Sequence, residues 1–245
     1  MASLTAKDLF GTEKVVPRQP IVLCLDTSSS MGRVSDDGMP APIDLVTHGL
    51  KLMYKELCED KVGRDASDIY ILAFGGSTKQ PTTMLKSFGS ITEWTPPSEL
   101  IAKGKTFLGT ALLEAKELLK QRVRWYKDEG LRYYEPWIIL MTDGRPSTED
   151  VPMAKRARQC LKAAQGDNIE DVLLYTFFAC EKELLSCEIA QENLAFLRSL
   201  YPDGQGEGFL GTLTMDEFSF DAFFQWVSLS ASHPGRRHAI RMGNR

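Results

Sequence analysis

The stretch Ile21-Val-Leu-Cys-Leu-Asp-Thr-Ser-Ser-Ser30 joins a short apolar run to a polar turn. An apolar run of this length, closed by turn residues, is typical of a strand that is buried on both faces of a sheet. Two further runs have the same form, since Ile69–Phe74 ends at a pair of glycines and Trp137–Met141 ends at Thr142 and Asp143. The sequence therefore predicts buried strands that carry polar groups at their carboxyl ends.

Segments with helical spacing separate these runs. Ile43–Cys58 has apolar residues at intervals of three and four, and Thr110–Trp125 is rich in strong helix formers. Alternating strands and helices favour parallel strands joined by right-handed crossovers. We therefore predict an α/β fold, a doubly wound and mostly parallel open sheet with helices on both faces. The other predicted elements are strands at Thr83–Phe88, Val172–Cys180 and Phe209–Leu213 and helices at Val151–Ala164, Glu188–Leu200 and Met215–Leu229.

Composition narrows the class of protein. The chain has 245 residues, of which 43% are hydrophobic and 25% charged, as in soluble globular domains. Its net charge of −4 gives no general electrostatic reason to expect nucleic acid or an anionic membrane as a partner. No apolar run approaches the roughly 20 residues that span a bilayer, and the N-terminus lacks the apolar core of a signal peptide. We therefore expect a cytoplasmic protein without membrane insertion.

Five side chains with oxygen atoms are expected at the carboxyl edge of the sheet, where ligands bind in open α/β folds. They are Asp26, Ser28, Ser30, Thr106 and Asp143. A hard cation such as Mg²⁺ prefers about six oxygen ligands. Only two of the five groups are anionic, so the ion would be short of negative charge and would favour an incoming carboxylate. The sequence therefore predicts a metal site that docks an acidic group of a partner.

Other interpretations of these residues remain open. An Asp-x-Ser-x-Ser pattern also occurs in ordinary turns whose serines cap the next helix. Gly104-Lys-Thr106 resembles the end of a nucleotide-binding loop, but Glu99 stands where that loop needs a glycine. Asp26 at a strand end leaves a Mg²⁺-dependent phosphoryl-transfer enzyme as the alternative function. Against it, Ser28 stands where such an enzyme needs a second Asp as acid and base.

Three motifs resemble those of a known family. Leu23-Cys-Leu-Asp-Thr-Ser-Ser-Ser-Met31 is similar to the metal-ion-dependent adhesion site of von Willebrand A (vWA) domains. Gly104-Lys-Thr-Phe-Leu-Gly-Thr-Ala-Leu112 resembles that family's Gly-x-Thr loop, and Ile138-Ile-Leu-Met-Thr-Asp-Gly144 its Thr-Asp-Gly strand end. The aromatic segment Phe218–Ser230 is similar to the end of the bacterial TerY-type proteins of tellurite-resistance and related stress operons. The resemblance covers residues 18–232, which leaves an N-terminal extension at 1–17 and a basic tail at 233–245 that we expect to be flexible.

The resemblance implies more than the residues do alone. It implies one antiparallel edge strand, here Thr83–Phe88, and a Mg²⁺ ion held by the same five residues, with Mn²⁺ or Ca²⁺ as substitutes. It implies an adaptor that binds an exposed Asp or Glu of a partner and is not itself an enzyme. TerY-type genes are associated with a protein kinase and a PP2C-type phosphatase, which makes those two proteins candidate partners.

Four residues are candidates for the surrounding partner surface. Asp36 and Asp37 lie in the loop Gly32–Pro42, which is longer than the family usually has, although acids on such a loop are commonly just solvated. Trp94 precedes a Pro-Pro pair near the Thr106 loop, where it would form a rim of the site or anchor the loop. Arg145 follows Asp143 closely and completes the set.

Overall fold

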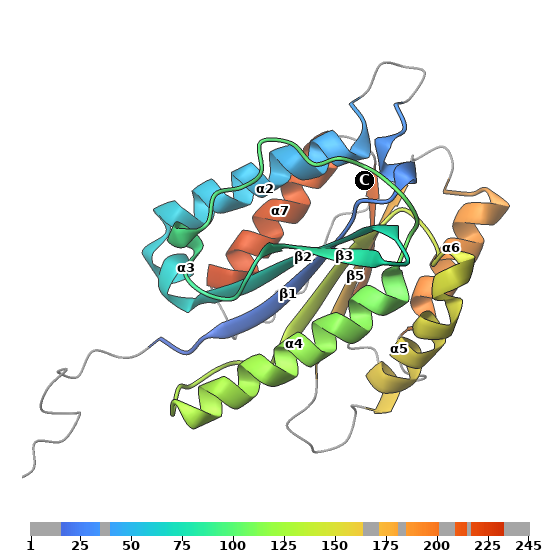
Figure 1. The fold of residues 1–245 in the computed structure, drawn as a ribbon. Helices are drawn as coiled ribbons and strands as arrows, with labels where there is room; N and C mark the ends of the chain where they lie inside the picture. Colours follow the sequence, from blue (N-terminus) through green and yellow to red (C-terminus); the bar gives the residue numbers. More distant parts are fainter. Residues whose placement is uncertain are drawn as a thin grey trace, which may run out of the picture.

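The computed structural model is built around a single sheet (Figure 1). It describes residues 16–34, 40–163, 172–180, 185–200, 209–214 and 217–232. Within these ranges six strands follow the order β3-β2-β1-β4-β5-β6. They are β1 (Gln19–Asp26), β2 (Ser67–Ser77), β3 (Gln80–Lys86), β4 (Trp137–Thr142), β5 (Leu173–Cys180) and β6 (Phe209–Thr214). All neighbouring strands pair in parallel except β2 and β3, so the predicted open sheet with one antiparallel edge strand is confirmed.

Helices cover both faces of the sheet (Figure 1). One face carries α2 (Pro42–Glu59), α3 (Lys61–Ala66) and α7 (Glu217–Ser232), and the other carries α4 (Leu108–Asp128), α5 (Val151–Ala163) and α6 (Glu188–Arg198). Short 3₁₀ helices lie in the connections, as η1 (Ser29–Gly32), η2 (Ile91–Glu93) and η3 (Thr148–Asp150). Across the described ranges, no helix has the length and apolar character to cross a membrane.

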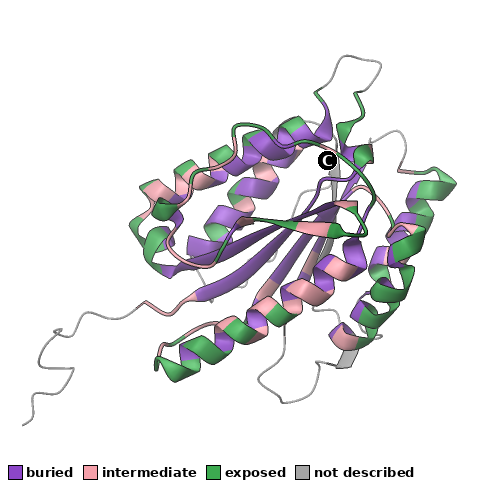
Figure 2. Ribbon diagram, in the orientation of Figure 1, coloured by how far each residue is buried: buried purple, intermediate pink, exposed green. Residues whose placement is uncertain are grey.

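Strand β1 shows why its apolar run is continuous. Side chains of a strand alternate between the two faces of a sheet. Ile21, Leu23 and Leu25 accordingly belong to the core under α2 and α7. Val22 and Cys24 belong to the second core, under α4, α5 and α6. All eight residues of β1 are buried, and Figure 2 shows the strands buried along the centre of the sheet. The two cores therefore explain why the strand is apolar at every position from Ile21 to Leu25.

Several predicted elements begin or end a few residues away from their observed bounds, and two differences have a clear physical cause. Strand β3 begins at Gln80 instead of Thr83, because Ser77 pairs with Gln80 across a tight turn. An edge strand tolerates this polar start, since one of its sides is solvated. Helix α3 was not predicted, and the Asp60 carboxylate begins it by accepting hydrogen bonds from the backbone N–H groups at positions 62 and 63. Both differences lie outside the central strands.

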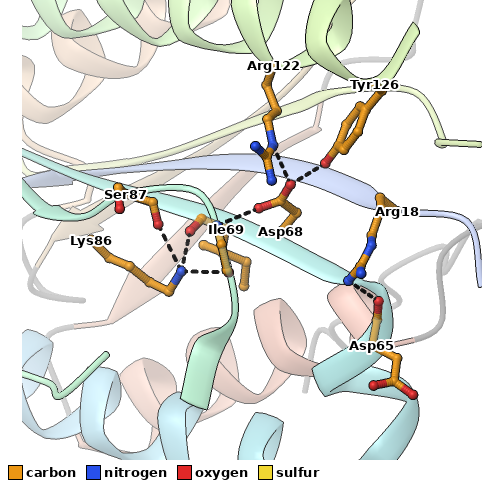
Figure 3. Close-up of polar contacts among 9 residues, drawn as sticks. Arg18, Asp65, Asp68, Ile69, Lys86, Ser87, Arg122 and Tyr126 are labelled. Carbon is orange, nitrogen blue, oxygen red and sulfur yellow. Dashed lines mark hydrogen bonds and ion pairs between the residues drawn. The ribbon is translucent and has the colours of Figure 1, made fainter. Parts of the chain in front are cut away.

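A buried polar cluster formed by Asp68, Arg122, Tyr126 and Lys86 connects α4 and strand β3 to the start of β2 (Figure 3). Asp68 is 2% exposed. Its carboxylate accepts hydrogen bonds from Arg122 Nε at 2.6 Å, from the Gly89 N–H at 2.9 Å and from the Tyr126 hydroxyl. Because Asp68 pairs in register with Pro20, the cluster lies at the amino end of the parallel strands. It is therefore at the opposite end of the sheet from Asp26.

Lys86 completes this cluster on the β3 side. Its ammonium group donates to the carbonyl oxygens of Ile69 at 3.1 Å, Ser87 at 2.9 Å and Gly89 at 3.0 Å (Figure 3). Burial lowers the pKa of Lys86 to about 8, although the nearby Asp68 carboxylate acts in the opposite direction. Three carbonyl partners satisfy all three ammonium donors, which is how the edge strand accommodates a buried cation.

Candidate metal centre

Four of the five predicted ligands meet at the carboxyl ends of β1 and β4. These strands are parallel neighbours, so Asp26 and Asp143 leave the sheet at the same edge. The turn after β1 then brings its serines across to β4. The Ser28 and Ser30 hydroxyl oxygens lie 3.1 Å apart, and the Ser30 hydroxyl donates to Asp143 Oδ1 at 2.9 Å. The structure therefore places these four side chains in one continuous group of oxygens.

Asp26 is held in a defined orientation at the centre of this group. It is fully buried. Its Oδ1 accepts a hydrogen bond from the Ser28 N–H at 2.8 Å, and its Oδ2 accepts one from the Thr142 hydroxyl at 2.6 Å. Thr142 belongs to the Thr-Asp-Gly motif after β4, and the motif alone does not indicate a role for its hydroxyl. The structure shows that it orients the Asp26 carboxylate.

Thr106 reaches the same edge through the backbone of its loop. The Ser29 N–H donates to the Gly104 carbonyl oxygen at 3.1 Å, which ties the loop to the β1 turn. Gly104 has a φ of +70°, and a Cβ there would lie 2.0 Å from the Gly76 carbonyl oxygen. Only glycine fits this approach between the loop and the end of β2. Thr106 itself is 9% exposed.

The connection after β4 fixes the Thr106 loop from its other side. Thr106 and Ser147 form a reciprocal pair, in which the Thr106 N–H donates to Ser147 Oγ at 2.9 Å and the Ser147 N–H donates to the Thr106 carbonyl oxygen at 2.9 Å. The buried Asp150 carboxylate accepts from the Thr110 hydroxyl at 2.6 Å, from the Thr110 N–H at 3.1 Å and from the Gly109 N–H. Asp150 thus caps α4 from a distant segment, a role that no local pattern in the sequence predicts.

Replacing Asp150 with Ala is expected to destabilise the protein by about 1–3 kcal/mol, because buried N–H groups at the start of α4 lose their acceptor. Urea unfolding monitored by circular dichroism measures the change. Glu149→Ala is the matched control, since Glu149 forms an exposed ion pair with Lys105 that should contribute less than about 1 kcal/mol. Equal destabilisation by the two substitutions would show that Asp150 does not act as the cap.

Burial raises the pKa values of both carboxyl groups. The pKa of Asp26 rises to about 7, first because of burial and then because of the negative charge of Asp143, while hydrogen bonds from Thr142 and Ser28 act to lower it. Burial also raises the pKa of Asp143, against the Ser30 hydrogen bond and the charge of Arg33. Two adjacent buried anions are unfavourable unless a cation neutralises them.

The chemistry of the donors selects the kind of cation that fits. The five predicted ligands offer oxygen atoms alone, which suits Mg²⁺, Mn²⁺ or Ca²⁺ better than zinc. Among the residues that the structure describes, no three His, Cys, Asp or Glu side chains gather in a way that would hold a metal ion. Within the described residues, Asp26 and Asp143 are therefore the two carboxylates of this group, and the low anion count of the site stays a prediction.

The candidate partner residues lie in different settings. The Trp94 indole donates to the Leu85 carbonyl oxygen at 2.8 Å and its ring packs edge-on against Tyr54, so Trp94 anchors its loop to the core. Arg145 is about half exposed and pairs with Glu192 at 2.7 Å. Asp36 and Asp37 lie outside the described residues, as do the basic tail 233–245 and most of the N-terminal extension. A partner-binding role for these four residues stays a prediction.

Comparison with known proteins rests on structure alone. No protein-family model matches this sequence, and no curated protein is significantly similar to it. The pilus adhesin SpaC from Lactobacillus rhamnosus GG has a TM-score of 0.57 at 11% identity over 89% of this chain. The PilB minor pilin from Streptococcus sanguinis has a TM-score of 0.55 at 12% identity over 88% of this chain. The chain spans 31% of the SpaC structure and 62% of the PilB structure.

A third similar structure is itself a single domain of the expected class. The vWF domain of the type V pili tip protein Mfa5 from Porphyromonas gingivalis has a TM-score of 0.50 at 11% identity. It aligns over 89% of this chain and 97% of its own length. Together with the sheet order and the antiparallel edge strand, these likenesses show that the chain has a vWA-like fold. At such low identity they concern the fold and do not distinguish subgroups within it.

Proposed function

We propose that this chain is a metal-dependent protein-interaction module. A divalent cation, most simply Mg²⁺, would be held by the Asp26 and Asp143 carboxylates and the Ser28, Ser30 and Thr106 hydroxyls. The observation that carries the proposal is the contact of Ser30 with Asp143 beside the buried Asp26, which assembles ligands from two strand ends. With Asp26 and Asp143 as its two anionic ligands, the ion would be short of negative charge, and an Asp or Glu of a partner protein would complete its coordination.

The setting of Asp26 favours binding over catalysis. The phosphoryl-transfer alternative requires a second acid two residues after the nucleophile, and Ser28 stands at that position. The hydrogen bonds that Asp26 accepts from Thr142 and from the Ser28 backbone hold its carboxylate in one orientation and leave lone pairs for a cation. We therefore propose an adaptor without catalysis of its own.

The biological setting is proposed on sequence resemblance. The motifs at Leu23–Met31 and Ile138–Gly144, together with the aromatic segment Phe218–Ser230, are similar to those of TerY-type proteins. On that basis we propose a role in a bacterial stress or tellurite-resistance system in the cytoplasm. A protein kinase or PP2C-type phosphatase encoded in the same operon is the first partner to test.

A pull-down from the native host tests this function. The tagged full chain is incubated with lysate in Mg²⁺ or in excess EDTA, and bound proteins are identified by mass spectrometry. We expect a specific partner in Mg²⁺ that is lost in EDTA and returns when Mg²⁺ is added back, because the ion bridges the two proteins. A specific partner whose recovery is equal in Mg²⁺ and in EDTA would contradict the proposal.

A further inference from the structure

A groove of about 450 Å³ opens beside the candidate metal centre, between α5 and α6. Its lining begins at Arg145, two residues after Asp143, and continues along α5 to Phe196 on α6. Figure 1 shows these two helices together on one side of the molecule, away from α2 and α3. The groove therefore begins close in the chain to Asp143, where a partner bound at the metal centre would lie.

The walls of the groove are cationic. Arg145, Lys155 and Arg158 line it, in a chain whose net charge is −4. The Arg145 guanidinium is neutralised in part by Glu192, with 2.7 Å between their nitrogen and oxygen atoms. Lys155 and Arg158 are exposed and form no ion pair with any residue that the structure describes. The groove therefore presents two positive charges that are available to a ligand.

The floor of the groove is apolar. Val151 is 37% exposed on the first turn of α5, and Ala154 and Phe196 continue the same surface. Exposed apolar side chains next to charged rims are a common feature of protein-binding surfaces. A ligand that fits both walls and floor must carry acidic groups and at least one apolar side chain.

We propose that this groove binds an acidic, apolar-anchored segment of the partner protein whose carboxylate completes the metal centre. Acidic side chains of the segment pair with Lys155 and Arg158, and an apolar side chain packs against Val151 and Phe196. This inference rests on the proposed function for the partner's first contact. A protein segment fits better than nucleic acid, because the phosphates of nucleic acid gain nothing from the apolar floor of the groove.

Fluorescence anisotropy tests the groove with a defined probe. The probe is a fluorescein-labelled peptide with one Asp followed by alternating Glu and Leu, titrated with the full chain in Mg²⁺ and in EDTA. The test variant is Lys155→Glu with Arg158→Glu. The matched control is Lys55→Glu with Lys61→Glu, which reverses two exposed charges on α2 and α3. We expect the test variant to raise the Kd at least about tenfold, by like-charge repulsion, and the control to change it less than about threefold.

The outcomes separate the groove from the metal centre. If the wild-type protein binds the peptide more weakly in EDTA than in Mg²⁺, the metal centre is supported. If the Lys155→Glu, Arg158→Glu variant weakens the binding that remains in EDTA, the groove is supported. Equal binding of the wild-type protein in Mg²⁺ and in EDTA, together with weaker binding by the Lys155→Glu, Arg158→Glu variant, would refute the proposed metal dependence and leave the groove proposal standing. Three results would overturn the proposal for the groove. The test and control variants could bind the peptide equally, a peptide with Gln in place of Glu could bind as tightly as the acidic one, or the peptide could fail to bind at all. Stronger displacement by a single-stranded oligonucleotide than by unlabelled peptide would overturn it in favour of nucleic acid.

Discussion

The variant Asp26→Asn is expected to lower the affinity for Mg²⁺ by more than about a hundredfold, since it removes one of only two anionic ligands.

The same change should stabilise the metal-free protein at pH 8. Folding raises the pKa of Asp26 from its ordinary value of 3.8 to about 7. The folded state therefore binds more protons than the unfolded state between these pH values, and stability falls as the pH rises through this window. At pH 8 the Asn variant avoids a penalty on the order of 2–4 kcal/mol.

Two measurements check both halves of this expectation. Isothermal titration calorimetry follows Mg²⁺ binding, and urea unfolding at pH 5 and pH 8, in Mg²⁺ and in EDTA, follows stability. Saturating Mg²⁺ should stabilise the wild-type protein more at pH 8 than at pH 5, because the ion binds the deprotonated carboxylates. Asp44→Asn, an exposed acid on α2, is the matched control and should change neither property. Unchanged Mg²⁺ affinity in Asp26→Asn would remove Asp26 from the metal site.

Asp68→Ala is expected to destabilise the protein by about 3–5 kcal/mol, the cost of leaving a buried charge without its partner. Arg122 loses its carboxylate, and the Gly89 N–H and the Tyr126 hydroxyl lose their acceptor. Because the cluster lies at the amino end of the strands, Mg²⁺ affinity should stay within about twofold of wild type under native conditions. Urea unfolding and calorimetry on the same samples separate the two effects.

A nearby exposed acid provides the comparison for Asp68. Asp65→Ala, on α3, should change the free energy of unfolding by less than about 0.5 kcal/mol. The double variant Asp68→Asn with Arg122→Met should recover part of the loss, since it leaves neither charge buried alone. Destabilisation by Asp68→Ala of no more than about 1 kcal/mol would mean that the cluster contributes little to the fold.

The parts of this structure that were predictable are those with a local signal. The run from Ile21 to Leu25 is apolar at every position because β1 faces two cores, so its pattern identified a central strand. The strand ends at Asp26 and Asp143 then followed from the rule that parallel strands present their carboxyl ends at one edge. Four of the five predicted ligands lie in one hydrogen-bonded group, and Thr106 is tied to it through its loop.

The parts that were missed depend on contacts between distant segments. Asp150 precedes α5 and would be expected to cap that helix, yet its carboxylate binds the first turn of α4, about forty residues earlier in the chain. Asp68 and Arg122 are separated by 54 residues, and nothing in either local sequence indicates the pairing. Helix α3 is six residues long, too short for a helical pattern to stand out. Local sequence patterns therefore locate the ends of strands, but they do not show which hydrogen bonds and ion pairs hold the connecting segments in place.

Diffraction from crystals soaked in Mn²⁺, with the anomalous signal of the ion, tests the central claim most directly. We predict one anomalous peak within about 2.5 Å of the Ser28 and Ser30 hydroxyl oxygens. We expect an Asp26 or Asp143 oxygen to contact the ion there, either directly or through one water. We also predict that the peak disappears in crystals of Asp26→Asn. A fully soaked crystal without a peak at these residues, while Ser30 still donates to Asp143, would contradict the metal-dependent interaction proposed for this protein.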